Sequence, residues 1–338
     1  MPVDRDTTDR ASAPMERLLY EVKKVIVGQD VLLERLAVAL LARGHLLVEG
    51  VPGLAKTMAI KTLAASIGGQ FKRIQFTPDL VPADLIGTRI YNQKTGEFST
   101  SLGPVFTNLL LADEINRAPA KVQSALLEVM QEQQVTIGLD TFKVPTPFLV
   151  LATQNPIETE GTYALPEAQV DRFMLKVLVG YPSHTEEYAI VERMTGPLDA
   201  VAQVLSTDQL VDLQKAADRI YVDPSLFDYA VRLASATRQP GAFGMPDLQR
   251  YITFGASPRA SINLILSARA LALIRGRGYA LPQDVADMVR DVMRHRLVLS
   301  FEALSDNITS DDILTRVLRT IPAPTVPTKE LPNVNIHA

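Results

Sequence analysis

Residues 50–57 read Gly-Val-Pro-Gly-Leu-Ala-Lys-Thr, the spacing of a phosphate-binding loop, G-x-x-x-x-G-K-[S/T], with Ala55 in place of the second glycine. Such a loop points backbone N–H groups and a helix N-terminus at an anion. Lys56 would reach the β- and γ-phosphates of a nucleotide, and Thr57 would hold Mg²⁺ through its hydroxyl. If the backbone at Ala55 needs a positive φ, the alanine costs about 1 kcal/mol there. The alternative is a tight turn in a fold that binds no nucleotide.

A second set of polar side chains follows apolar runs further along the chain. Asp113 and Glu114 come directly after Leu109–Ala112, and Asn155 follows the run that ends at Ala152. Opposite a phosphate loop, Asp113 would hold the Mg²⁺ shell through water, and Glu114 would act as general base toward the attacking water. Asn155 could orient that water or bind the γ-phosphate. Without the loop, each would be explained as the end of a strand.

Two arginines are candidates for stabilising charge on a transferred phosphate. Arg172 lies in the segment Pro166–Phe173, and Arg259 stands one residue inside a predicted helix start. A guanidinium suits this task because it binds phosphate oxygens in a bidentate manner. An arginine at a helix N-terminus opposes the helix dipole, which indicates another role for Arg259. For either arginine alone, a surface salt bridge is the simpler explanation.

Composition bounds the class of protein. The chain has 338 residues, which suggests two domains or one large one, and its net charge of −4 argues against extensive nucleic-acid binding. It contains no cysteine, which excludes disulfides, thiolate metal sites and cysteine nucleophiles. The polar, acidic N-terminus and the absence of a bilayer-length apolar run predict a cytoplasmic protein with no membrane span.

The elements that must position these residues show two different sequence patterns, one in each part of the chain. Between about residues 45 and 180, short apolar runs predict the buried parallel strands of an α/β fold: Leu46–Val48, Phe71–Phe76, Leu109–Ala112, Phe148–Ala152 and Phe173–Val179. From about residue 206 the pattern predicts helices. Proline near the first helical position marks three of them, at Pro224, Pro258 and Pro282, and Ser310 starts a last helix.

In this order, the motifs resemble the MoxR family of AAA+ ATPases, from about Glu16 to Arg319. Their joint presence makes the match specific. The resemblance implies a P-loop NTPase αβα sandwich with a C-terminal all-helical lid, and the Ala55 form of the loop looks like this family's own variant. The residues that carry it are Ile26–Asp30, Gly50–Thr57, Pro82–Gly87, Gly103–Phe106, Leu111–Ala118, Ala152–Pro156, Leu165–Phe173 and Gly255–Ala260.

The resemblance also implies an ATPase that assembles into a ring, typically a hexamer, with ATP between subunits. Asn155 matches the first sensor, Arg259 the second sensor, and Arg172 the arginine finger donated to a neighbour; Arg117 is a competing candidate. Gln75 could switch Glu114 on and off. The residues implied to bind nucleotide, with Thr57 and Asp113 also holding Mg²⁺, are Val27, Gly28, Gly50, Val51, Pro52, Gly53, Leu54, Ala55, Lys56, Thr57, Met58 and Asp113.

The predicted domain organisation follows from the same patterns. Residues 1–14 are expected to be a disordered tail, 15–181 the nucleotide-binding core, 182–205 a linker, 206–321 the helical lid and 322–338 a proline-rich tail. Within the core, residues 77–105 fit an insert of the family. Residues 133–147 predict a hairpin, because Val135 and Ile137 alternate on one arm and Phe142 and Val144 on the other.

The client on which such an ATPase acts is expected to be another protein. The resemblance implies chaperone-like remodelling or metal insertion on a partner with a von Willebrand factor A domain. Three alternatives remain at this point: a kinase, a magnesium-chelatase-type motor subunit, and a nucleic-acid motor. The last would use a basic cluster in a late helix, formed by Arg290, Arg294, His295 and Arg296.

Overall fold

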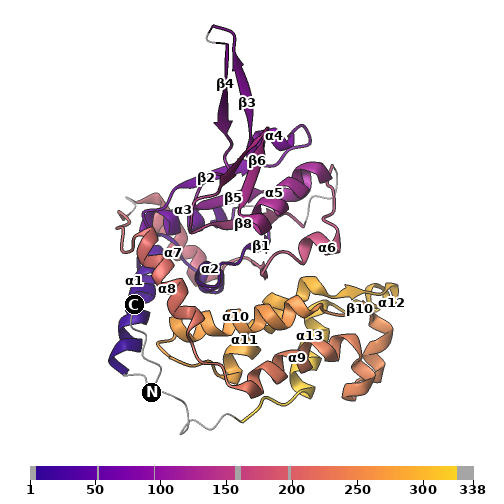
Figure 1. The fold of residues 1–338 in the computed structure, drawn as a ribbon. Coiled ribbons are helices and arrows are strands. Elements are labelled where there is room, and N and C mark those ends of the chain that lie inside the picture. The colour runs from indigo at the N-terminus through magenta and orange to yellow at the C-terminus, as the bar shows by residue number, and fades with distance from the viewer. Residues whose placement is uncertain (1–4, 52, 95, 157–160, 197–198, 326–338) are drawn as a thin grey trace. The chain divides into compact units, whose positions relative to one another are not determined.

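The computed structural model describes residues 5–51, 53–94, 96–156, 161–196 and 199–325 (Figure 1). The chain forms two compact units. One comprises Arg17–Phe173 and Val177–Val211, and the other comprises the described parts of Met1–Glu16, Met174–Lys176 and Asp212–Ala338.

A five-stranded sheet forms the centre of the first unit. Its order is β2-β5-β8-β1-β9, and the pairs β2–β5, β5–β8 and β8–β1 are parallel. All five predicted strands are present. β5 and β8 lie inside the sheet and are buried along nearly their whole length, as apolar runs without alternation predict, whereas the edge strand β2 is largely exposed. Their bounds are Leu46–Glu49 (β1), Phe71–Gln75 (β2), Leu109–Asp113 (β5), Leu149–Gln154 (β8) and Leu175–Leu178 (β9).

The register of this sheet aligns the carboxyl ends of its strands. Gln75 on β2 stands opposite Asp113 on β5, and Val48 on β1 stands opposite Thr153 on β8. In open α/β sheets, ligands bind in the crevice outside these ends. The polar residues that end β2, β5 and β8 are therefore gathered at one edge.

Helices pack against the sheet through apolar stripes. On α5, for example, Val122, Leu126 and Val129 are buried in one cluster with Leu110 and Val150 of the sheet. The helices up to residue 218 are Arg5–Val25 (α1), Asp30–Leu41 (α2), Lys56–Ser66 (α3), Pro82–Ile86 (α4), Ala120–Glu132 (α5), Glu167–Val170 (α6), His184–Thr195 (α7) and Thr207–Asp218 (α8), with a 3₁₀ turn at Ile115–Arg117.

A buried histidine joins β8 to α5. The Nδ1 atom of His45 accepts a hydrogen bond from Val150 N–H at 3.0 Å, and its Nε2 lies 3.1 Å from the Met130 carbonyl oxygen. Burial lowers the pKa of His45 from 6.5 to about 4. The ring is therefore neutral near pH 7, as its role as an acceptor requires.

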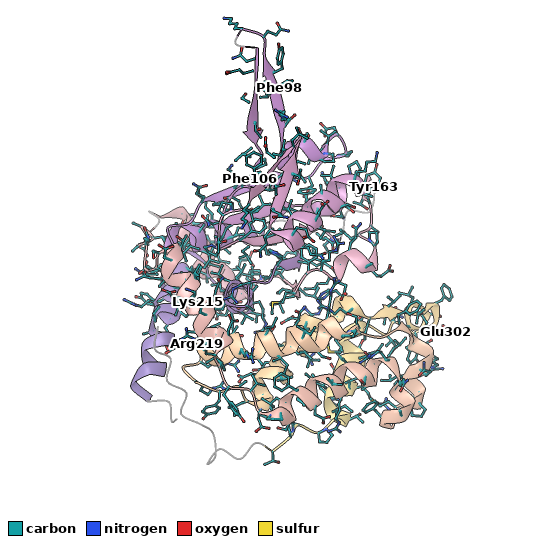
Figure 2. The ribbon with its side chains drawn as sticks, in the orientation of Figure 1. Phe98, Phe106, Tyr163, Lys215, Arg219 and Glu302 are labelled. Atoms are coloured by element: carbon teal, nitrogen blue, oxygen red, sulfur yellow. The ribbon has the colours of Figure 1, made fainter. Side chains whose placement is uncertain are left out.

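Two hairpins extend from the first unit. β3 (Gly87–Asn92) pairs with β4 (Glu97–Leu102) in the predicted insert, and β6 (Gln134–Ile137) pairs with β7 (Asp140–Lys143) in the predicted hairpin. The first hairpin projects beyond the sheet (Figure 1). Phe98 on it is 60% exposed, whereas Phe106, which follows the hairpin, is buried in the core (Figure 2).

The second unit is mainly helical. The helices at Pro224, Pro258, Pro282 and Ser310 begin where the sequence predicts them. They are Pro224–Arg238 (α9), Pro258–Ile274 (α10), Pro282–Met293 (α11) and Ser310–Thr320 (α13). The prediction missed the short elements between them, which are Pro240–Phe243 and Pro246–Tyr251 in 3₁₀ conformation, β10 (Ile252–Phe254), Arg294–Arg296 in 3₁₀ conformation, β11 (Val298–Leu299) and α12 (Phe301–Ser305).

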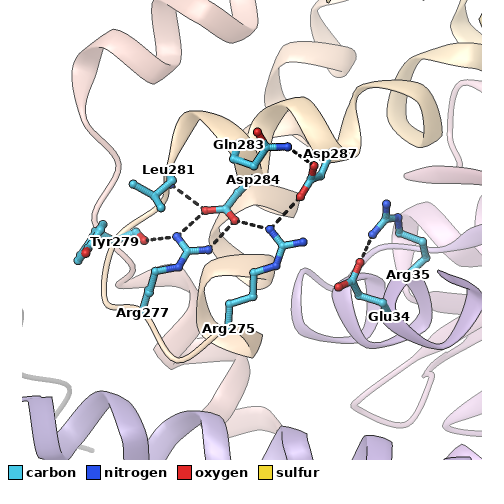
Figure 3. A network of polar contacts seen from close by, with 9 residues as sticks. All are labelled: Glu34, Arg35, Arg275, Arg277, Tyr279, Leu281, Gln283, Asp284 and Asp287. Atoms are coloured by element: carbon cyan, nitrogen blue, oxygen red, sulfur yellow. Dashed lines mark hydrogen bonds and ion pairs between the residues drawn. The ribbon is translucent and has the colours of Figure 1, made fainter. Parts of the chain in front are cut away.

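A fully buried carboxylate fixes the start of α11. The Asp284 oxygens accept bonds from Arg277 at 2.6 and 2.7 Å, from Arg275 at 2.9 Å and from the Leu281 N–H at 2.8 Å (Figure 3). Arg275 also reaches Asp287 at 2.8 Å. Two guanidinium groups and one amide thus compensate the burial of the Asp284 charge, which is the condition for keeping a charge inside a protein.

Two predictions about irregular segments are wrong. Residues 5–14 lie in α1 and are not a disordered tail, because burial of Met15, Leu18 and Val22 on one face anchors that helix. The predicted linker 182–205 contains α7, which begins with a capping box between Ser183 and Glu186. Residues 1–4 and 326–338 lie outside the described residues.

No helix in the described part of the chain is both long and apolar enough to cross a bilayer.

Candidate functional site

The predicted phosphate-binding loop connects β1 to α3. Gly53 has a φ of 86°, and Ala55, the residue before α3, has a φ of 56° in the left-handed region. The loop therefore keeps the backbone conformation that a glycine would adopt, and the alanine is strained by about 1 kcal/mol. The Lys56 ammonium donates to the Gly50 carbonyl oxygen at 2.6 Å, which folds its side chain over the loop. Pro52 lies outside the described residues.

A cavity of about 550 Å³ lies beside this loop and the carboxyl ends of the strands. It brings together residues predicted from three separate stretches of sequence. Those predicted residues are Gly50, Gly53, Leu54, Ala55, Lys56, Thr57, Met58, Asp113, Glu114 and Asn155, and the cavity is also lined by Lys61, Arg73, Gln75, Thr153 and Gln154.

The Lys56 ammonium group and two carboxylates line the cavity. Burial lowers the pKa of Lys56, and the nearby carboxylates of Asp113 and Glu114 oppose that shift. Asp113 is the last residue of β5 and Glu114 follows it with a left-handed φ of 56°. The cavity thus places an ammonium group, a helix N-terminus and two carboxylates around one space, which is the composition of a site for an anion with a metal ion.

Thr153, which was not among the predicted residues, links the Asp113 carboxylate to the backbone of Glu114. Its hydroxyl donates to Asp113 Oδ1 at 2.6 Å and accepts from the Glu114 N–H at 2.9 Å. The residue is 2% exposed. A hydroxyl can donate and accept at once, so Thr153 orients the Asp113 carboxylate and fixes the backbone at Glu114. A polar residue at the end of a strand next to β5 is the signal that could have indicated it.

Replacing Thr153 with valine should lower the free energy of unfolding by about 1–3 kcal/mol, because the partly buried Glu114 N–H loses its acceptor. Thr153→Ser keeps the hydroxyl and is the matched control. Urea unfolding followed by circular dichroism measures both variants. Equal stability of Thr153→Val and wild type would show that the hydrogen bonds of the Thr153 hydroxyl do not stabilise the fold.

Three further side chains surround the two acids. Gln75 Nε2 donates to Glu114 Oε2 at 2.6 Å, and Arg117 Nε lies 3.1 Å from the same oxygen. Arg73 donates to Asp113 Oδ2 at 2.6 Å through Nη2 and at 3.1 Å through Nε. Gln75 is thus in contact with Glu114, as a switch would need to be. Arg73 was not predicted.

A smaller cavity of about 300 Å³ shares Gly53, Leu54 and Ala55 with the first. Val27 lines it, and Gly28 does not; Gly28 has a φ of 70°, and a Cβ there would come within 2.8 Å of the Glu186 side chain. The lining is mainly apolar and suits a flat aromatic ring. Its other residues are Val25, Ile26, Gln29, Tyr181, Pro182, Glu187, Ile190, Val191, Arg193 and Met194.

The remaining predicted residues lie elsewhere. Val51 does not line either cavity. Arg172 is exposed and is followed by the fully buried Phe173. Arg259 is exposed in the first turn of α10 and belongs to the second unit, so its proximity to the cavity stays a prediction.

The late basic cluster does not form a basic face. His295 and Arg296 are buried at 9% and 6% exposure. Arg294 is ion-paired with Asp291 at 2.8 Å and with Asp311 at 2.9 Å. Arg290 is exposed and donates to the Thr315 hydroxyl at 3.1 Å. These arrangements remove the feature on which a nucleic-acid motor was based.

Two family models match the chain. Residues 45–175 match the family described as "ATPase family associated with various cellular activities (AAA)", and residues 247–317 match the AAA lid domain. The first match contains β1, the loop, both acids, Asn155 and Arg172. The second contains α10 and α11, including Arg259.

Known proteins are similar over most of the chain. Chaperone MoxR1 of Mycobacterium tuberculosis is 58% identical over 312 residues, covering 92% of this chain and 83% of that protein. Protein MoxR of Methylorubrum extorquens is 31% identical over 346 residues, covering 96% and 98%. The crystal structure of a Cytophaga hutchinsonii protein superposes with a TM-score of 0.90 at 44% identity, covering 95% of this chain and 98% of that one.

Proposed function

Because the chain belongs to the MoxR family of AAA ATPases, we propose that it hydrolyses ATP with Mg²⁺ in a ring of subunits and uses the cycle to remodel a partner protein. The observation that carries the proposal is the cavity of about 550 Å³, which gathers Lys56, Thr57, Asp113, Glu114 and Asn155 at the carboxyl edge of the sheet. Chaperone activity of the MoxR type fits a cycle that opens and closes this site.

The loop and the two cavities support binding of a whole nucleotide. The N-terminus of α3 and the Lys56 ammonium would hold the phosphates, and the apolar cavity lined by Val27 would hold the base. The two cavities meet at Gly53, Leu54 and Ala55, where the sugar and α-phosphate would lie. We assign the residues of the loop to phosphate binding on this basis.

The donor set fits Mg²⁺. The Thr57 hydroxyl and the Asp113 carboxylate line the same cavity, and Mg²⁺ prefers oxygen ligands, often one or two from the protein with water and substrate phosphate completing the shell. When bound, the ion would neutralise charge on the phosphates. Thr57 would hold it directly, and Asp113 would hold it through water.

Glu114 is the proposed general base. Its carboxylate would accept a proton from the attacking water, and Asn155 would orient that water. In this structure Glu114 accepts a hydrogen bond from Gln75 and lies 3.1 Å from Arg117, so its lone pairs are partly engaged. We infer that release of these contacts accompanies activation.

We propose that Arg172 completes the site of a neighbouring subunit in the ring, which by family resemblance is a hexamer. Arg172 is exposed, whereas Arg117 contacts Glu114 of its own chain, and this contrast favours Arg172 as the arginine donated in trans. Arg259 would sense the γ-phosphate from the lid.

The client is proposed to be a protein with a von Willebrand factor A domain, on which the ring acts as a cytoplasmic chaperone, with metal insertion as one form of that activity. A magnesium-chelatase-type subunit shares the architecture, and it would be stimulated by a chelatase partner in place of such a client.

ATP turnover per subunit against protein concentration, in the presence of Mg²⁺, tests the ring. We expect specific activity to climb with concentration, because each site needs a neighbour. Sedimentation velocity with a non-hydrolysable analogue should show an assembled species over the same range. Flat specific activity from a monomer would mean that the site is complete within one chain.

A further inference from the structure

We propose that Arg73 is a positioning residue that occupies the metal-ligand carboxylate Asp113 before the Mg–nucleotide complex binds, and that binding of the complex displaces it. This role rests on the proposed function and concerns the same site. Through Arg73, β2, which is the edge strand of the sheet, would lower the affinity of the site for Mg²⁺.

The contacts of Arg73 define its position. Its Nη2 donates to Asp113 Oδ2 at 2.6 Å and to Gln75 Oε1 at 2.9 Å, while Nε lies 3.1 Å from Asp113 Oδ2. Arg73 and Gln75 are two residues apart on β2, so both side chains lie on one face. β2 pairs directly with β5, which carries Asp113.

Both oxygens of Asp113 are engaged as a result. Oδ1 accepts from the Thr153 hydroxyl at 2.6 Å, and Oδ2 is held by Arg73. A carboxylate that binds a metal, directly or through water, must direct lone pairs toward it. An arginine cation on Oδ2 competes for those lone pairs, and its charge repels an incoming divalent cation.

The exposure of the pair is consistent with exchange. The Arg73 side chain is 49% exposed, and that of Asp113 is 17% exposed. An ion pair with one half-exposed partner contributes little to the free energy of unfolding. Breaking it when a metal ion binds therefore costs little stability. Arg73 can turn into solvent when it is released.

Arg73 also connects the metal ligand to the general base. It donates to the Gln75 side-chain oxygen, and the Gln75 amide donates to Glu114 Oε2 at 2.6 Å. When Arg73 leaves Asp113, Gln75 loses one of the bonds that orient it. These two hydrogen bonds therefore couple binding of Mg²⁺ at Asp113 to release of Glu114 from Gln75.

Binding of a fluorescent mant-labelled AMP-PNP, titrated with MgCl₂ and repeated in EDTA, tests the proposal. In Arg73→Ala, we expect half-saturation at about threefold to fivefold less MgCl₂ than in wild type, the effect of one exposed ion pair. Lys72→Ala is the matched control. It removes the same charge from the next residue of β2, where the strand period places the side chain on the opposite face. Arg73→Lys should lie between Arg73→Ala and wild type.

The outcomes separate the two proposals. If wild type binds the analogue equally with MgCl₂ and with EDTA, the proposed Mg²⁺ dependence fails. If wild type depends on MgCl₂ and Arg73→Ala has the same half-saturation as Lys72→Ala, only the role of Arg73 is overturned. A higher MgCl₂ requirement in Arg73→Ala would overturn it as well, because Arg73 would then assist binding. Far-UV circular dichroism of each variant shows that it is folded.

Discussion

Replacing Arg172 with alanine should lower ATP turnover in the proposed ring about a thousandfold and leave nucleotide affinity within about twofold of wild type. An arginine donated to a neighbour would stabilise charge that develops only in the transition state. Arg172 is exposed, while the next residue, Phe173, is fully buried. The buried phenylalanine fixes the backbone and leaves the guanidinium available to another subunit. Turnover and mant-nucleotide affinity, measured on the same preparations, check the expectation.

The control for this variant is Arg117→Ala. Arg117 lies 3.1 Å from Glu114 in its own chain, so its removal changes the surroundings of the base within one subunit. If Arg172→Ala keeps wild-type turnover while Arg117→Ala loses it, the assignment of the donated arginine is reversed.

Replacing Glu114 with glutamine should lower turnover about a hundredfold to ten-thousandfold, the range for loss of a general base, with the nucleotide still bound. Glutamine has nearly the same shape and can still accept from the Gln75 amide, so the local structure is retained. It cannot take a proton from water. Glu128→Gln, an exposed acid on α5, is the control that removes the same charge away from the cavity.

The two variants together give a sharper result than either alone. An equal mixture of Arg172→Ala and Glu114→Gln subunits, dissociated and reassembled, should recover about one quarter of wild-type turnover, since random neighbours complete that share of sites in a head-to-tail ring. Recovery requires that the base and the arginine come from different chains. A mixture as inactive as its components would place both residues in one subunit.

The parts of the fold that the sequence predicts best are those in which one residue type has one physical use. The runs Leu109–Ala112 and Phe148–Ala152 are apolar without alternation because both faces are covered, and they appear as β5 and β8. Pro224, Pro258 and Pro282 begin helices because a proline loses nothing at that position.

The errors arise where weak local signals compete with packing. The segment around α7 was predicted as a linker although Ser183 and Glu186 form a capping box, since no residue of that helix is buried to give a strong apolar period. The polar start of α1 suggests disorder, yet the buried stripe further along the helix extends the structure to Arg5.

At the site, residues at the ends of strands could be predicted because parallel strands bring their carboxyl ends together. Asp113, Glu114 and Asn155 line one cavity with Lys56 for this reason. Thr153 lies near a strand end as they do and could have been noted, but its contacts, like those of Arg73, could not be predicted. Their contacts depend on which strand neighbours β5 and in what register, and a single sequence does not contain strand order.

Ala55 and Glu114 are two non-glycine residues with a φ of 56°, and both line the same cavity. Each holds a backbone conformation that glycine would adopt with less strain. A laboratory selection for heat resistance alone would therefore favour glycine at both positions. At position 55 it would restore a common form of the loop, but at position 114 it would remove the carboxylate proposed as the general base. Heat tolerance and turnover are thus expected to oppose each other at position 114 and not at position 55, so a screen for stable variants needs to measure activity as well as melting.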